Sequence, residues 1–130
     1  MTKSELLSIR AKKKQLERVM RKLIKLQDEK NIDVVKDYRH SKKGIPIVIR
    51  GYNIAEVQKL RSMYIAQSAE LLRSIVEIET WINNIPNVWL QVIASMRYID
   101  GMKRIEIAEE CHYSEATIKL RLAEIDSLLE

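Results

Sequence analysis

Residues 111–121 contain the side chains whose types and spacing could do chemistry. Cys111 stands directly before His112, which places a nucleophile beside a base, but neighbours in a tight turn rarely align for proton transfer. Cys111 is better explained as a small core residue. A lone cysteine also excludes an intrachain disulfide and a closed zinc site. We therefore expect no enzyme, no catalytic residue, no metal and no cofactor.

The residues that follow are of types that contact DNA. Glutamate accepts from cytosine N4, lysine donates to guanine, and alanine or threonine methyl groups meet the thymine methyl. The candidate base-reading residues are Glu115, Ala116, Thr117, Lys119 and Leu120. The candidate phosphate contacts are Arg97, Lys103, Arg104, Ser114 and Arg121. Alternatively, Glu115 complements the helix dipole, and Lys119 and Arg121 form a solvated face.

Three short helices are expected to position these side chains. Pro86 suits the first turn of a helix over 86–99, and Gly101 suits its left-handed C-terminal cap. A second helix is expected over 103–111, and Ser114 can cap a third. The expected buried residues, in chain order, are Val88, Trp89, Val92, Ile93, Met96, Ile99, Ile105, Ala108, Cys111, Ile118, Leu122, Ile125 and Leu129. This order of elements is typical of a helix-turn-helix, whose last helix enters a DNA groove.

Residues 96–118, MRYIDGMKRIEIAEECHYSEATI, resemble the pattern L-R-Y-x-x-G-x-x-x-x-E-I-A-E-x-x-x-Y-S-E-x-T-V of sigma-70 region-4-like helix-turn-helix proteins. Among these, phage and prophage transcriptional regulators of Firmicutes also place a long basic helix, a loop and a second long helix before the motif. The resemblance therefore extends over nearly the whole chain. It implies a transcriptional regulator that binds double-stranded promoter DNA, with RNA polymerase as a further potential partner.

One feature departs from that family, and a second weakens the expectation of DNA binding. His112 stands where the family usually has glycine, at a turn that needs a left-handed residue, so His112→Gly is expected to be neutral or stabilising. Residues 86–130 contain five Lys and Arg against eight Asp and Glu, a net charge of −3. Because phosphate neutralisation supplies most non-specific affinity, this segment alone should bind DNA weakly.

The first 85 residues are expected to form a long helical arm. A helix is expected from Ser4 to about Lys30, capped by Thr2 with Glu5 and basic on its outer faces, either as a second phosphate or RNA contact or as a solvated surface. A second helix over 53–85 has a heptad pattern that favours a coiled-coil hairpin or a seam between copies. The expected oligomer seam comprises Val57, Leu60, Tyr64, Leu71, Ile78 and Trp81.

Residues 31–52 are expected to form the loop between these helices. A connection of this length is either partly disordered or functional. Residues 45–50 are β-prone and could pair with a second copy, although a linker is favoured. Trp81 and Trp89 are expected to pack the joint around Pro86.

Composition narrows the class of protein further. Three glycines cannot build a dinucleotide fingerprint or a P-loop. No apolar run approaches the roughly 20 residues that cross a bilayer, and the N-terminus lacks a signal-peptide core. Residues 1–50 carry a net charge of +9, from 15 basic and six acidic residues. A cytoplasmic protein of a bacterial host, without a membrane partner or a small-molecule substrate, is expected.

The sequence therefore predicts an all-α protein with a long helical hairpin or coiled-coil arm (1–85) followed by a trihelical helix-turn-helix domain (86–130). The expected function is promoter recognition as a phage-type transcriptional regulator, as a homodimer. Two alternatives remain. One is a phage small-terminase-like DNA-packaging recognition subunit, which forms rings. The other is a protein-interaction module that binds RNA polymerase or another regulator without reading DNA.

Overall fold

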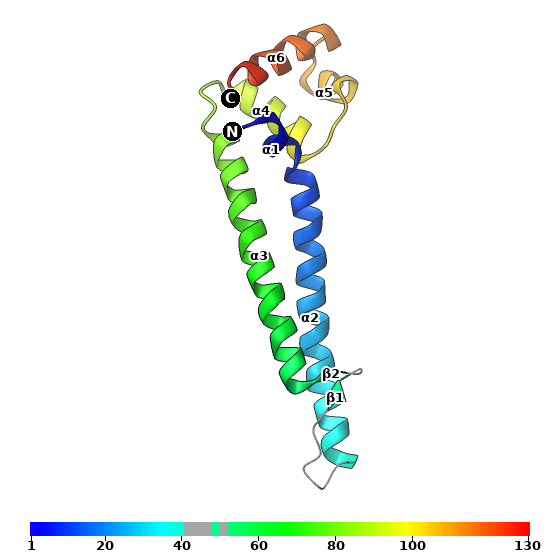
Figure 1. The fold of residues 1–130 in the computed structure, drawn as a ribbon. Helices are drawn as coiled ribbons and strands as arrows, with labels where there is room; N and C mark the ends of the chain where they lie inside the picture. The colour runs from blue at the N-terminus through cyan, green and yellow to red at the C-terminus, as the bar shows by residue number, and fades with distance from the viewer. Residues whose placement is uncertain (41–47, 50–51) are drawn as a thin grey trace. The chain divides into compact units, whose positions relative to one another are not determined.

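The computed structural model describes residues 1–40, 48–49 and 52–130, and the side chains of 1–26 and 54–130 (Figure 1). Within these ranges the chain is mainly α-helical, as the sequence predicts. The elements are α1 (Lys3–Leu7), α2 (Ile9–His40), β1 (Val48–Ile49), β2 (Tyr52–Asn53), α3 (Ile54–Asn83), α4 (Val88–Ala94), the π-helical turn η1 (Ser95–Ile99), α5 (Arg104–Cys111) and α6 (Glu115–Ser127). No helix in the described ranges is long and apolar enough to cross a membrane.

The N-terminal helix is broken once and runs further than expected. The Thr2 side chain accepts from the Glu5 backbone N–H at 3.2 Å, which confirms the predicted cap. Ser8 then separates α1 from α2, with its hydroxyl donating to the Glu5 carbonyl at 2.6 Å. The prediction of a loop over 31–52 is wrong for residues 31–40, which are helical, because they contain neither glycine nor proline to end the helix. Residues 41–47 and 50–51 of that loop lie outside the described residues.

A short antiparallel pair precedes α3. Val48 pairs with Asn53, and Ile49 pairs with Tyr52. Two residues of the β-prone stretch, Val48 and Ile49, therefore pair within the same chain, and the rest of the stretch lies outside the described residues.

Two compact units are distinguished by their internal contacts. We call residues 1–14 and 73–130 the terminal unit and residues 15–72 the central unit. The expected boundary near residue 85 differs from this division. The end of α3 belongs with the C-terminal helices, since Ile78, Ile82 and Ile85 share one core with Leu90 and Ile93.

The buried face predicted for α4 and the following turn is correct in part, because Ile93 is fully buried and Met96 and Ile99 pack against the core. Leu90, Ile93 and Ala94 are buried, whereas Val88 and Trp89 are 69% and 53% exposed. The helix begins after Pro86, because the Asn87 side chain caps it by accepting from the backbone N–H groups of residues 89 and 90. The following π-helical turn then shifts the helical phase, so that Tyr98 is buried.

The helices α5 and α6 complete this core, each packing on the other, and α4 also packs on α6. On α5, Ile107 and Ala108 are buried, and the predicted core residue Ile105 is 55% exposed. The predicted stripe of α6 faces the core, and two of its four members, Ile118 and Ile125, are fully buried. Leu122 and Leu129 pack against the same core as partly buried residues.

In the central unit, α2 and α3 run antiparallel and side by side (Figure 1). Leu26 and Val57 are buried together, with Leu60 and Tyr64 packed against them. The Lys22 ammonium also lies 5.7 Å from the centre of the Tyr64 ring, within cation–π range.

These contacts correct the prediction of an oligomer seam. Val57, Leu60 and Tyr64 pack on α2 of the same chain. Ile78 and Trp81 pack in the core of the terminal unit, and Leu71 is half-buried. The heptad therefore describes intrachain packing. It also omitted Ile75 and Ile82, which are buried.

Candidate nucleic-acid interface

The turn between α5 and α6 has the geometry that the sequence predicts. His112 adopts a left-handed conformation, with φ 58° and ψ 37°. The Tyr113 N–H donates to the Ala108 carbonyl at 3.0 Å, and the His112 N–H donates to the Glu109 carbonyl at 3.4 Å. This pair of bonds is the Schellman motif, which ends a helix and satisfies its last carbonyls. The turn thus sets where α6 begins.

Ser114 caps α6 as predicted. Its hydroxyl accepts from the Thr117 backbone N–H at 3.2 Å and lies 2.8 Å from the Thr117 hydroxyl. Thr117 is half-buried, so its side chain is engaged in the cap. Both residues were predicted to contact DNA, yet in this structure their hydroxyls position the start of α6.

The other predicted base-reading residues lie on the exposed side of α6. Glu115, Ala116, Lys119 and Leu120 are exposed, and Leu120 is 66% accessible. Lys119 makes no ion pair with any described side chain. Because Ile118 anchors the helix from its buried face, these four side chains project from a fixed element.

The predicted phosphate contacts differ in whether their side chains already bind a partner within the chain. The Arg97 guanidinium donates through Nη1 to the Met102 carbonyl at 3.1 Å. Arg121 pairs with Glu124 at 2.8 Å. The Lys103 backbone N–H donates to the Glu106 carboxylate at 3.3 Å, which caps α5, and Arg104 is exposed. Arg97 and Arg121 are thus partly committed to contacts within the chain.

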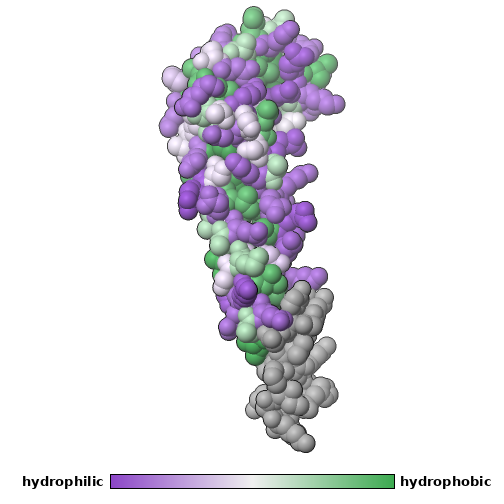
Figure 2. Space-filling model, viewed as in Figure 1, coloured by the Kyte–Doolittle hydropathy of each residue, from purple (hydrophilic) through white to green (hydrophobic). Residues whose placement is uncertain are grey.

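Acidic residues lie near the candidate DNA-contacting residues of α5 and α6. Glu106, Glu109, Glu110 and Glu115 are all exposed on α5 and at the start of α6. On the viewed face of the terminal unit, hydrophobic residues are scattered among hydrophilic ones and form no continuous apolar patch (Figure 2). The structure therefore retains the electrostatic difficulty seen in the sequence, since one copy neutralises few phosphates.

An exposed aromatic pair lies beside the turn, and sequence reasoning missed it. The rings of Trp89 and Tyr113 meet edge to face, with centroids 5.8 Å apart. Trp89 was expected to pack the joint around Pro86, a role that Trp81 fills by packing against the core. The Asn87 cap signal identifies the true first residue of α4 and could have revealed this exposure.

Several lysines of the basic N-terminal segment bind partners within the terminal unit. The Lys3 ammonium contacts Asp126 at 2.5 Å and the Tyr98 hydroxyl at 2.7 Å. Burial alone lowers the pKa of Lys3, but the hydrogen bonds to Asp126 and Tyr98 outweigh it, so the pKa is raised. Lys12 donates to Ser74 at 2.5 Å, and Lys13 pairs with Glu79 at 2.6 Å.

Cys111 lacks the surroundings of a nucleophile. Its pKa is raised by burial and by the neighbouring Glu110, so the thiol stays protonated near neutral pH. Its Sγ lies 3.9 Å from the Met96 sulfur, and no hydrogen bond joins it to His112 in the described part of the chain. Among the described residues, no group of three or more His, Cys, Asp or Glu could hold a metal ion.

The Ser114 cap and the left-handed turn at His112 fix where α6 begins, and with it the positions of its exposed side chains. No protein-family model, curated protein or solved structure matches this chain.

Proposed function

We propose that the chain is a phage-type transcriptional regulator that binds double-stranded promoter DNA, with α5, the turn and α6 acting as a helix-turn-helix. In such motifs the N-terminal residues of the second helix contact base edges in the major groove. The main support for this proposal is the exposure of the first residues of α6. The Ser114-capped start of α6 exposes Glu115, Ala116 and Lys119 while its opposite face is anchored in the core.

The helix α4 with η1 would serve as the supporting helix of a trihelical domain. It packs on α6, and η1 packs on α5. This arrangement holds both motif helices through apolar contacts and leaves their outer faces for DNA. Such a function needs no cofactor and no catalytic group, and it places the protein in the bacterial cytoplasm.

A homodimer is part of the proposal because one copy neutralises few phosphates. Two copies related by a two-fold axis present two α6 helices to half-sites about 34 Å apart, or multiples of that spacing. The heptad seam is occupied within the chain, but Ile65 and Leu72 lie one heptad apart on α3 and are 49% and 52% exposed. We propose this second apolar stripe of the central unit as the contact between copies.

The test is selection of bound sites from random duplex DNA, followed by Lys119→Ala and Glu115→Ala on the selected sequence. Each substitution should weaken binding by about 1–3 kcal/mol and relax the preference at one base pair. The matched controls are Lys59→Ala and Glu77→Ala, which remove the same charges from exposed positions of α3. Binding of both α6 variants at wild-type strength and specificity would refute the assignment.

A protein-interaction module is the second candidate, and the exposed Trp89–Tyr113 pair beside an acidic surface favours it. Such a module would bind RNA polymerase or another regulator without reading DNA. The same selection experiment distinguishes the two, because this candidate predicts that no sequence is enriched. Light scattering adds a further test, since a large ring would instead indicate a packaging recognition subunit.

A further inference from the structure

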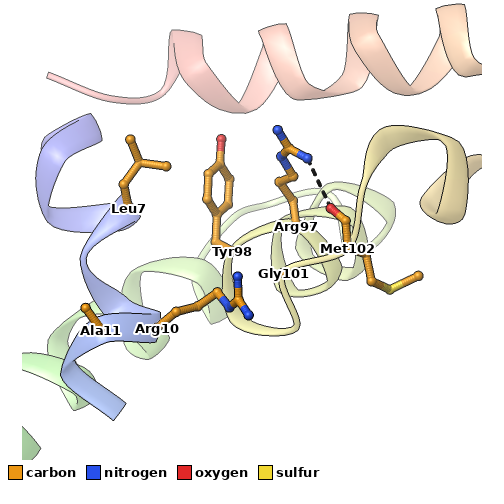
Figure 3. Close-up of a pocket in the computed structure, with 7 residues that line it drawn as sticks. All are labelled: Leu7, Arg10, Ala11, Arg97, Tyr98, Gly101 and Met102. Carbon is orange, nitrogen blue, oxygen red and sulfur yellow. Dashed lines mark hydrogen bonds between the residues drawn. The ribbon is translucent and has the colours of Figure 1, made fainter. Parts of the chain in front are cut away.

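The terminal unit contains a pocket of about 460 Å³, and Arg97 is the one residue of its lining that is also a candidate phosphate contact (Figure 3). Leu7, Arg10 and Ala11 line one side, from the end of α1 and the start of α2. Arg97, Tyr98 and Met102 line the other, from η1 and the residues that follow it. Its volume lies within the range of about 300–1,000 Å³ that is usual for small-molecule sites.

Arg10 supplies an unpaired positive charge to this pocket. Its guanidinium makes no hydrogen bond or ion pair with any residue that the structure describes. It lies against Gly101, where an added Cβ would collide with the guanidinium carbon and Nη1. Gly101 also has φ +71°, which glycine adopts without strain. A glycine at this position therefore both ends η1 and leaves room for the arginine.

Arg97 supplies a second positive charge, held in place by the backbone. Its Nη1 donates to the Met102 carbonyl at 3.1 Å, as the dashed line in Figure 3 shows. A guanidinium has five N–H donors in a planar fork, so this bond leaves most of them for another acceptor. Arg97 is half-buried, which weakens solvent screening of its charge.

No carboxylate is among the residues that line the pocket. The Tyr98 hydroxyl accepts from the Lys3 ammonium at 2.7 Å and donates to Asp126 at 3.3 Å, and Asp126 is itself paired with Lys3 at 2.5 Å. Arg10 and Arg97 thus both line a pocket whose lining contains no acidic residue, and an oxyanion could accept charge-assisted hydrogen bonds there. Leu7, Ala11 and the Tyr98 ring add an apolar wall.

We propose that this pocket binds a small organic anion, whose carboxylate or phosphate group contacts Arg10 and Arg97 and whose apolar portion lies against Leu7 and Ala11. The proposal shares Arg97 with the candidate phosphate contacts, but Arg10, Leu7 and Ala11 belong to the pocket and not to the proposed DNA interface. Binding would stabilise the terminal unit by mass action, since the ligand joins the start of α2 to the residues that precede α5.

Isothermal titration calorimetry at low salt tests the proposal with phenyl phosphate, benzoate, inorganic phosphate and phenol. We expect one of the two aromatic anions to bind at least tenfold more tightly than inorganic phosphate, and phenol not to bind. The tighter of the two identifies the acid group as phosphate ester or carboxylate. Absence of binding by both aromatic anions, or equal affinity for inorganic phosphate, would overturn the proposal.

Substitutions locate the site. Arg10→Gln should weaken binding at least tenfold, and Arg97→Lys should weaken it because lysine lacks the planar fork. Arg18→Gln is the matched control, since it removes the same charge from an exposed position outside the pocket. Equal affinity of Arg10→Gln and Arg18→Gln would place the anion elsewhere and overturn the proposal. Displacement of the aromatic anion by a short DNA duplex would also overturn it, by assigning the two arginines to a DNA phosphate. Thermal unfolding of each variant verifies that it remains folded.

Discussion

Replacing His112 by glycine should stabilise the protein. His112 occupies the left-handed region with φ 58°, where a Cβ is close to the following carbonyl oxygen. That conformation costs a residue with a Cβ about 1–2 kcal/mol. The exposed imidazole makes no hydrogen bond within the described residues, so its removal sacrifices no contact there.

The gain is reduced by the unfolded state, in which glycine has more freedom than histidine. That term opposes folding by about 0.4–1 kcal/mol. The difference between the two ranges is a net stabilisation of about 0–1.6 kcal/mol, with a midpoint of about 0.8 kcal/mol. For a chain of this length, about 1 kcal/mol corresponds to a few degrees in Tm, so we expect a rise of about 2–4 °C.

Thermal unfolding followed by circular dichroism measures this shift, and His112→Ala is its control. Alanine keeps the Cβ and removes the imidazole, so its Tm should stay within about 1 °C of the wild type if the backbone conformation is responsible. A lower Tm for His112→Gly would refute the reasoning. An equal rise for His112→Ala would also refute it, because the imidazole would then be the source of strain.

Two further outcomes follow from burial and charge. Ile93→Ala should lower the free energy of unfolding, measured in urea, by about 2–5 kcal/mol because Ile93 is fully buried. Trp89→Ala should lower it clearly less because Trp89 is half-exposed. A larger loss for Trp89→Ala than for Ile93→Ala would contradict the assigned buried face of α4. Lys3 has a raised pKa in the folded state, so its contribution of about 0.5 kcal/mol is fully present below the unfolded value near 10.5 and is lost as pH rises through the folded value. Lys3→Met should therefore show a smaller loss of stability in that alkaline range than the wild type, and an identical loss in both proteins would remove Lys3 as its source.

Caps and turns could be predicted from the sequence because their hydrogen bonds join residues a few positions apart. The Thr2 and Ser114 caps and the left-handed Gly101 and His112 all lie where local residue types indicate them. Each depends on one side chain and one or two backbone groups, so distant packing rarely overrides it. The start of α6, and with it the candidate reading residues, could therefore be placed in advance.

Buried faces were harder to predict, because they depend on helical phase. The stripe predicted for α4 assumed a helix that begins at Pro86 and keeps 3.6 residues per turn. The Asn87 cap and the π-helical turn at Ser95–Ile99 change both conditions. The same sensitivity explains why Ile105 is exposed while Ile107 is buried on α5.

The heptad pattern of α3 was assigned to an oligomer seam for a different reason. A heptad pattern shows that a helix face must be covered, but not whether the same chain or a second copy covers it. Here α2 covers Val57 at one end of α3, and the terminal core covers Ile78 at the other. The pocket lined by Arg10 and Arg97 could not be predicted either. Its residues come from opposite ends of the sequence, and no local pattern indicates that they lie together.

Contacts within the chain also decide how far the net charge of +5 can contribute to DNA binding. Composition counts every lysine and arginine, but only those without an internal partner can neutralise phosphates. Lys3, Lys12 and Lys13 bind acceptors inside the terminal unit, whereas Lys14 and Arg18 are exposed. The salt dependence of DNA binding should therefore report fewer phosphate contacts than the basic composition of the first 50 residues predicts. Under the proposed function, base contacts from α6 and a second copy would supply the affinity that the charges do not.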